Sequence, residues 1–122
     1  MVYIVNETRG FAISADAQMR DTAEGRRKGL MGSERMDVVL KVAWDSRMLP
    51  MIHMFGMRYP IDVVWVNGRM EAVDVRRKVP LSRLLDPRTW RMYAPRTPAR
   101  YVVEVGKGDI RDTAIGDKIA FR

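Results

Sequence analysis

The chain has 122 residues, of which 47% are hydrophobic, so it can bury a core of its own without disulfides or a structural metal. Cysteine is absent, which excludes disulfide bonds, thiolate metal sites and cysteine nucleophiles. The net charge is +7, and the whole excess lies in residues 76–100, which hold eight cations and one anion.

The N-terminal part of the chain predicts two strands and a helix. Residues 2–8 form a short apolar stretch that predicts a first strand. Residues 11–19 alternate apolar side chains with small or polar ones, which is typical of a strand with one buried face. Residues 22–31 predict a short helix, because Asp21 and Glu24 have the spacing of a capping box.

The middle of the chain predicts a central hairpin. Residues 37–44 alternate like a strand, whereas prolines and a glycine around 48–57 favour an extended segment over a helix. Residues 61–66 are bulky on both faces and predict a strand in the centre of a sheet. The pair Asn67-Gly68 predicts a two-residue type I′ turn, followed by a return strand over 69–75.

Prolines interrupt the next part of the chain. Residues 76–98 hold four of the six prolines and predict a long, mostly irregular excursion with one helical turn at 81–85. Residues 101–105 and 118–121 predict the last strands. About eight short strands with one or two short helices predict a mainly β fold, as a β-sandwich, a jelly-roll-like fold or a partly closed barrel.

Three motifs occur together in the order of a known family. They are Thr22-x-x-x-Arg26-x-x-Gly29-Leu30-Met31, the stretch Ile-His-Met-Phe-Gly-Met-Arg-Tyr-Pro-Ile-Asp-Val-Val at 52–64, and 99–105 followed by Gly116-Asp117. With these motifs the chain resembles the domain of unknown function 192 family, also called uncharacterised protein family 0127. The resemblance implies a mainly β, jelly-roll-like fold, and it carries over no activity and no catalytic residue.

His53 and Asp62 are the residues on which an enzyme would depend. His53 is the only histidine, and Asp62 is the nearest acid in the second motif that would orient it, as in a hydrolase-type site. The alternative is structural: Asp62 anchors the corner after Pro60, with Arg58 or backbone N–H groups satisfying its charge, and His53 packs beside it. We favour the structural interpretation.

The interpretation we prefer is a non-enzymatic module that binds a small ligand or a protein partner. Its site would lie near the second motif and the end of the predicted helix. The candidate residues are Arg26, Gly29, Met31, His53, Met57 and Asp62. No metal-ligand cluster or phosphate-cradling glycine loop of recognised spacing occurs, so we expect no metal and no cofactor.

A second alternative is anion or nucleic-acid binding by the basic segment 76–100. Trp90 and Tyr93 lie among its cations, and arginines with aromatic rings suit phosphates and stacked bases. The other interpretation is a solvated loop whose rings fold back over the core. The candidate residues are Arg76, Arg77, Lys78, Arg88, Trp90, Arg91, Tyr93 and Arg96.

The first residues and the apolar runs of the chain bear on where in the cell the protein is located. The first ten residues have neither a basic start nor a sustained apolar run, so they do not predict a signal peptide. No uncharged apolar run approaches the length of a membrane helix. We therefore expect one cytoplasmic domain over residues 1–122.

Overall fold

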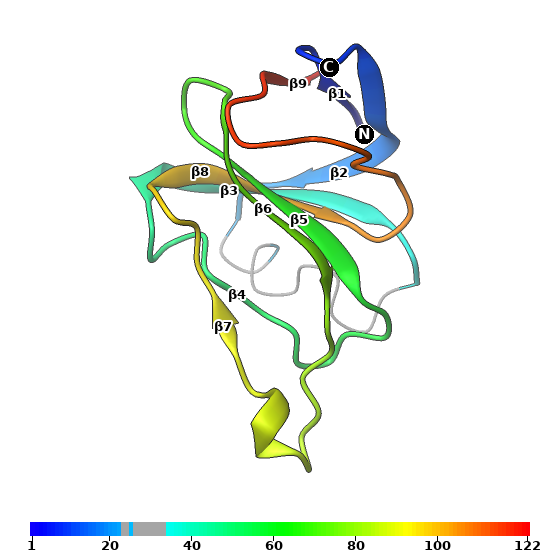
Figure 1. The fold of residues 1–122 in the computed structure, drawn as a ribbon, viewed down its shortest axis with the longest axis vertical. Coiled ribbons are helices and arrows are strands. Elements are labelled where there is room, and N and C mark those ends of the chain that lie inside the picture. Colours follow the sequence, from blue (N-terminus) through cyan, green and yellow to red (C-terminus); the bar gives the residue numbers. More distant parts are fainter. Residues whose placement is uncertain (23–24, 26–33) are drawn as a thin grey trace.

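The computed structural model describes residues 1–22, 25 and 34–122, and Figure 1 shows that their regular elements are nearly all strands. The strands are β1 (Val2–Asn6), β2 (Phe11–Arg20), β3 (Asp37–Ser46), β4 (Ile52–His53), β5 (Ile61–Val66), β6 (Ala72–Val79), β7 (Met92–Tyr93), β8 (Ala99–Val105) and β9 (Ile119–Phe121). A short 3₁₀ helix, η1 (Pro87–Thr89), lies between β6 and β7. The prediction of a mainly β fold is confirmed. The helix expected at 22–31 stays a prediction, because all of that range except Thr22 and Gly25 lies outside the described residues.

Seven strands form one curled sheet in the order β6-β5-β8-β3-β2-β1-β9. Its pairs are antiparallel except for β2 and β3, which are parallel. The curl brings the edge strand β9 back to the loop before β6, where Glu71 forms a bridge with Lys118. The Ile119 amide donates to the Met70 carbonyl there at 2.9 Å. The sheet is thus the partly closed barrel that was one of the predicted forms.

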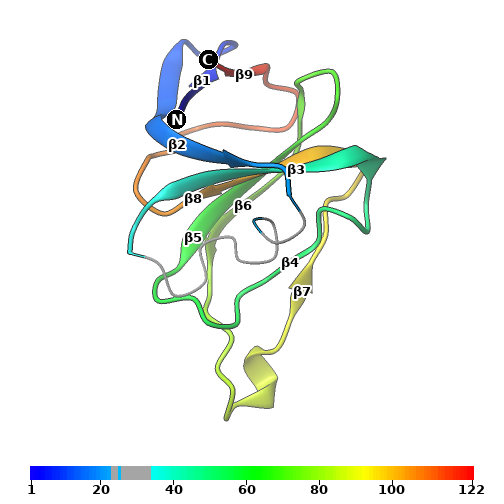
Figure 2. The same ribbon diagram turned by 180° about the vertical axis from the view of Figure 1, so that it is seen from behind.

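Two apolar clusters lie on opposite faces of this sheet. Val38 and Val63 belong to the cluster that packs against β4 and its surroundings, whereas Val39 and Val64 belong to the cluster enclosed by β1, β2 and β9. Figure 2 shows β3 and β8 crossing the middle of the molecule between these two regions. Residues 61–66 contribute to both clusters, which confirms the expected central strand.

A small second sheet starts a projection from the molecule. β4 pairs with β7, about forty residues later in the chain, through Ile52 with Tyr93 and His53 with Met92. Between β6 and β7 the chain runs away from the sheet and returns through η1, at the end of the molecule opposite β1 and β9 (Figure 1). We refer to residues 80–93 as the arm. No helix of the described residues is long and apolar enough to cross a membrane.

The hairpin between β5 and β6 is confirmed, but the prediction of a two-residue type I′ turn is wrong. Val66 pairs with Ala72, so residues 67–71 form the loop. The non-glycine residue with a left-handed backbone in this loop is Met70, with φ 64°, and Gly68 is not among the glycines with positive φ.

Side-chain contacts explain the wider turn. The Asn67 Oδ1 accepts hydrogen bonds from the Arg69 and Glu71 amides, both at 3.0 Å, and so holds an open loop. The Arg100 guanidinium packs closely over Gly68, because a Cβ there would lie 2.9 Å from the Arg100 Cζ and would displace that group. These are contacts with a distant strand and with local amides that a dipeptide signal does not report.

The segment after the hairpin also differs from prediction. β6 continues to Val79 instead of ending near Val75. The helical turn expected at 81–85 is wrong: the helical turn is η1, where the Asp86 side chain accepts from the Arg88 amide. A proline at the first position with an aspartate before it favours a helix start there.

Candidate interaction site

His53 and Asp62 lie on different strands, and each side chain serves a different backbone group. His53, on β4, accepts a hydrogen bond at Nδ1 from the Phe55 amide at 3.1 Å. Asp62, on β5, accepts one at Oδ1 from the Lys78 amide at 2.8 Å. No hydrogen bond joins the two side chains in the described part of the chain, so the structure does not bring the hydrolase-type pair together.

Asp62 has a structural partner. The register of β5 and β6 shifts between Ile61 and Val63, so β6 has an irregularity opposite Asp62. Lys78 takes a left-handed backbone there, with φ 51°, and the Asp62 carboxylate receives its amide. Asp62 therefore anchors this bend of β6, and not the corner after Pro60 that the sequence suggested.

The other candidates of the preferred site divide into core and undescribed residues. Met57 is half-buried and packs against the apolar cluster beneath β3, β5 and β8. An adaptable thioether suits such a gap in the core, which gives Met57 a packing role. Arg26, Gly29 and Met31 lie outside the described residues, so their convergence with His53 stays a prediction.

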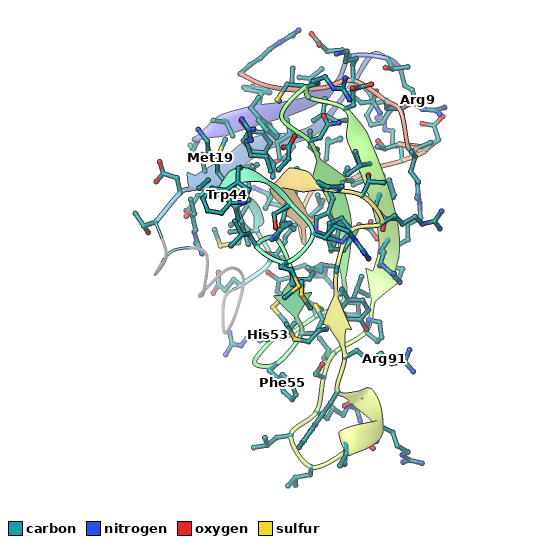
Figure 3. All side chains as sticks on the ribbon, turned by 90° about the vertical axis from the view of Figure 1, so that its left-hand side faces the viewer. Arg9, Met19, Trp44, His53, Phe55 and Arg91 are labelled. Carbon is teal, nitrogen blue, oxygen red and sulfur yellow. The ribbon has the colours of Figure 1, made fainter. Side chains whose placement is uncertain are left out.

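Aromatic rings connect β4 to the arm. The His53 and Phe55 ring centroids lie 5.8 Å apart, and those of Phe55 and Trp90 lie 5.7 Å apart in an edge-to-face arrangement. The Trp90 Nε1 donates to the Arg83 carbonyl at 2.8 Å. Figure 3 shows His53 and Phe55 near the base of the arm, with Arg91 beside strand β7. The second motif thus packs against the arm through the ring contact of Phe55 with Trp90.

A tight turn forms the tip of the arm. The Asp86 amide donates to the Arg83 carbonyl at 3.0 Å, which places Leu84 and Leu85 at the centre of the turn. The Thr89 hydroxyl receives the Arg83 amide at 2.7 Å and donates to the Asp86 carbonyl at 2.7 Å. These bonds satisfy the backbone of the turn internally and leave its two leucines pointing away from the fold.

Apolar side chains are exposed along the arm. The exposed fractions are 75% for Leu84, 95% for Leu85, 48% for Trp90 and 57% for Met92. Of the eleven large hydrophobic residues exposed in the described structure, these four fall within nine consecutive residues. The sequence analysis named Trp90 here but missed the leucines, because the pattern shows that they are apolar and not that the fold leaves them uncovered.

Most cations of the basic segment have partners in different directions. Three form ion pairs: Arg88 with Asp86 at 3.0 Å, Arg96 with Asp74 at 3.7 Å and Arg100 with Asp45 at 3.3 Å. Arg76 lies 5.6 Å from the centroid of the Tyr93 ring. Arg77 donates to the Arg111 carbonyl at 2.6 Å. Because these partners lie on different elements, the paired cations do not form the single cationic face that nucleic acid would need.

The remaining cations have no anionic partner at ion-pair distance. In the part of the chain that the structure describes, four side chains of the basic segment form no ion pair and no hydrogen bond: Arg76, which lies over Tyr93, and Lys78, Arg83 and Arg91. Arg83 begins the turn at the tip, whereas Arg91 follows η1 and lies beside β7, nearer the base of the arm (Figure 3). The arm therefore presents an apolar tip on a segment with a net positive charge, since Arg83, Arg88 and Arg91 face one acid, Asp86.

A buried carboxylate on the central strand β8 was also missed. Glu104 pairs across the sheet with Val38 on one side and Val63 on the other, and it is almost fully buried. Burial raises the pKa of Glu104 to about 7, against the opposing charge of Arg20. A glutamate among the valines at 102–105 was the signal that would have revealed it.

The third motif closes the barrel. The Asp117 Oδ2 accepts from Arg9 Nε at 2.6 Å, from Asn6 Nδ2 at 2.9 Å and from the Ala114 amide at 3.0 Å. Asn6 Nδ2 also donates to the Thr113 hydroxyl at 3.0 Å. Burial opposes ionisation of Asp117, but the bonds from Arg9, Asn6 and the Ala114 amide hold its pKa below the usual value. We call Asn6, Arg9, Thr113 and Asp117 the closing cluster.

An open groove of about 550 Å³ lies near this end of the molecule, lined by residues of the β1–β2 loop, of β9 with Lys118 before it, and of the β5–β6 loop. Its charged side chains form hydrogen bonds or ion pairs with other charged side chains or with the backbone. Glu7 accepts from Arg122 at 2.8 Å, and Lys118 donates to the Arg69 carbonyl at 3.1 Å. The groove therefore gives less support to a binding site than the arm does.

Comparisons with known proteins place the chain in a family. The family model of DUF192, described as Uncharacterized ACR, matches residues 4–121. A UPF0127 protein of Thermococcus gammatolerans is 33% identical, over 97% of this chain and 74% of its own. A UPF0127 protein of Pyrococcus furiosus is 30% identical, over 95% of each chain.

Two solved structures share the fold. A putative transcription regulator from Sinorhizobium meliloti has a TM-score of 0.77 at 17% identity, over 98% of this chain and 91% of its own. A protein of unknown function from Novosphingobium aromaticivorans has a TM-score of 0.79 at 15% identity, over 98% and 83%. At these identities the likeness establishes the fold alone.

Proposed function

The chain belongs to the DUF192 family, a family of unknown function, and we propose that this member is a binding module whose partner docks on the arm. One observation carries the proposal: four exposed apolar side chains gather on a segment that projects from the sheet, namely Leu84, Leu85, Trp90 and Met92. Single exposed hydrophobic residues are ordinary, but a contiguous group of them is typical of an interaction surface.

The construction of the arm supports this role. The turn at its tip is held by the Thr89 hydroxyl and by the Trp90 Nε1, so the two leucines are presented by an ordered backbone. Ordering before binding lowers the conformational entropy that docking must overcome. The ring contact between Phe55 and Trp90 ties the arm to the second motif. A binding role thus keeps the motif 52–62 in the site, as the sequence analysis proposed, but as its support.

The two alternatives have weaker support. Hydrolase-type chemistry needs His53 and Asp62 to act together, and each is occupied by a different backbone amide. Nucleic-acid binding needs several free cations on one face, and Arg88 and Arg96 are paired with carboxylates. A cytoplasmic location, expected from the sequence, remains part of the proposal.

Photocrosslinking tests the docking site. Leu85 and, as a matched control, the exposed Ile115 are each replaced by p-benzoylphenylalanine in the full chain, which is then irradiated in the cells that naturally make it. We expect covalent adducts, with protein or with lipid, from position 85 and none from position 115. Equal yields from both positions, or no adduct from position 85, would overturn the proposal.

A further inference from the structure

We propose that the partner of the arm is an anionic lipid surface, which the arm enters with its leucine tip. This inference rests on the proposed function, because it names the class of partner that docks on the same segment. It concerns contact with one face of a bilayer and not a membrane span, which the described helix is too short to provide.

The shape of the tip fits a bilayer. Leu84 and Leu85 occupy the centre of a convex turn at the far end of the molecule, and 75% and 95% of their surfaces are open (Figure 1). A lipid interface accepts a convex apolar tip without a preformed pocket, since the acyl chains rearrange around it. Burial of two leucines at that depth supplies the hydrophobic part of the attraction.

The order of chemistry along the arm matches the depth profile of an interface. The leucines come first, and Trp90, half exposed, follows behind η1 with its Nε1 already bonded to the Arg83 carbonyl. Tryptophan prefers the level of the lipid headgroups, where one side of the ring is apolar and the other is wet. Arg83 and Arg91 form no ion pair in the described structure, although the charge of Arg83 adds to the Arg88 hydrogen bond in lowering the pKa of Asp86, and the arm holds three cations against one anion. Lipid phosphates are the anions that would complete them.

Other partners leave part of the arm unexplained. Nucleic acid would engage Arg83 and Arg91 but would leave the two leucines in water. A protein groove would cover the leucines, but its strongest anchor would usually be an aromatic or arginine side chain. Trp90 is held against Phe55 and Arg83 and does not lead the tip. In the cytoplasm, the membrane surface that the arm would meet carries negative charge, which suits its unpaired cations.

Vesicle sedimentation tests the lipid assignment. The full chain is mixed with vesicles of phosphatidylcholine alone or of phosphatidylcholine with phosphatidylglycerol, and bound protein is measured over a range of lipid and salt. We expect binding to the anionic vesicles that weakens with salt. Changing Leu84→Ser and Leu85→Ser together should weaken binding by at least roughly tenfold. Changing Arg83→Gln and Arg91→Gln should cost roughly fivefold per arginine.

Matched controls separate these effects from general charge and hydrophobicity. Ile115→Ser removes an exposed apolar residue and Arg69→Gln an exposed cation, both away from the arm, and neither should change binding. Circular dichroism melts of every variant establish that it is folded. In a Trp44→Phe background, the Trp90 emission should shift to shorter wavelength on adding anionic vesicles.

The results distinguish the lipid inference from the docking proposal. No binding to anionic vesicles, or binding that the tip variants leave unchanged, would overturn the lipid assignment. If position 85 still crosslinks to a protein in cells, or if the chain associates with itself through the tip, the docking proposal stands and the lipid assignment falls. If position 85 gives no adduct and vesicles are not bound, both fall.

Discussion

The two ends of the molecule differ in whether their unusual side chains have partners within the chain. In the closing cluster, the buried Asn6, Thr113 and Asp117 find partners in one another and in the exposed Arg9, and Asp117 accepts three hydrogen bonds. On the arm, the exposed fractions of four apolar side chains range from 48% for Trp90 to 95% for Leu85. A buried polar group without a partner and an exposed apolar group both cost free energy. The chain removes the first cost within itself, and we propose that a partner removes the second.

The closing cluster should show the largest effect on stability. Asp117→Ala leaves the buried Asn6 amide and the Arg9 guanidinium without their shared acceptor. We expect the free energy of unfolding to fall by about 3 kcal/mol, measured by urea denaturation. Asp112→Ala removes the other carboxylate that Arg9 contacts, which is exposed, and should leave the denaturation midpoint nearly unchanged. Equal losses in the two variants would show that the cluster is not the closure we describe.

Glu104 offers a comparison within the sheet, because burial has the largest influence on the pKa of this carboxylate and raises it. Folding raises its pKa from 4.5 to about 7, so its protonated form is favoured in the folded state. The stability it contributes is therefore fully present below pH 4.5 and is lost as the pH rises through 7, by about 3 kcal/mol. Glu104→Gln should remove this slope and be more stable than the natural protein above pH 7. Parallel pH curves for the two proteins would contradict this prediction.

Asp117 should behave in the opposite sense. Its pKa is held below the usual value in the folded state by its donors, although burial opposes this. The stability it contributes is present above the pKa of the unfolded chain and is lost as the pH falls through the lower, folded value. Unfolding measured in acid should therefore show a loss in the natural protein that Asp117→Asn lacks. If both lose stability alike in acid, another carboxylate is responsible.

The tip of the arm should tolerate change that the closing cluster does not. Leu84→Ser with Leu85→Ser removes side chains that are mostly in water, so the free energy of unfolding should stay within about 0.5 kcal/mol of the natural value. Urea denaturation measures this on the protein used for vesicle binding. A large loss of stability would mean that the leucines serve the fold and not a partner.

The smallest expected effect concerns the order of the tip. Thr89→Val keeps the shape of the side chain but removes the hydroxyl that receives the Arg83 amide and donates to the Asp86 carbonyl. Hydrogen exchange of the Arg83 amide should become about tenfold faster, with global stability unchanged. No change in exchange would show that the turn is held by its backbone bond alone.

The sequence was informative where the signal is local. Residues 61–66 are apolar on both faces and form a central strand with the expected bounds, because burial from both sides leaves a continuous apolar run. The alternation at 37–44 likewise predicted most of β3. The hairpin after residue 66 was also predicted, but its width was not, since it depends on Asn67 side-chain bonds and on Arg100 packing over Gly68.

The candidate site was less accessible from sequence because its parts meet only in three dimensions. The motif at 52–62 was identified, but the pairing of β4 with β7 joins segments about forty residues apart. Spacing placed His53 and Asp62 in one motif without showing that they serve different amides. Leu84 and Leu85 were visible as apolar residues, yet their exposure follows from the turn that Thr89 and Trp90 hold.

The central claim is that the arm, and not the closed end of the barrel, meets the partner. Amide NMR spectra of the full chain titrated with anionic vesicles test it most directly, because each end has its own reporting amides. We predict that signals of residues 83–92 broaden first, while those of Asn6, Arg9, Thr113 and Asp117 stay unchanged. Broadening that begins at the closing cluster, or that leaves residues 83–92 untouched while the protein binds, would contradict the account.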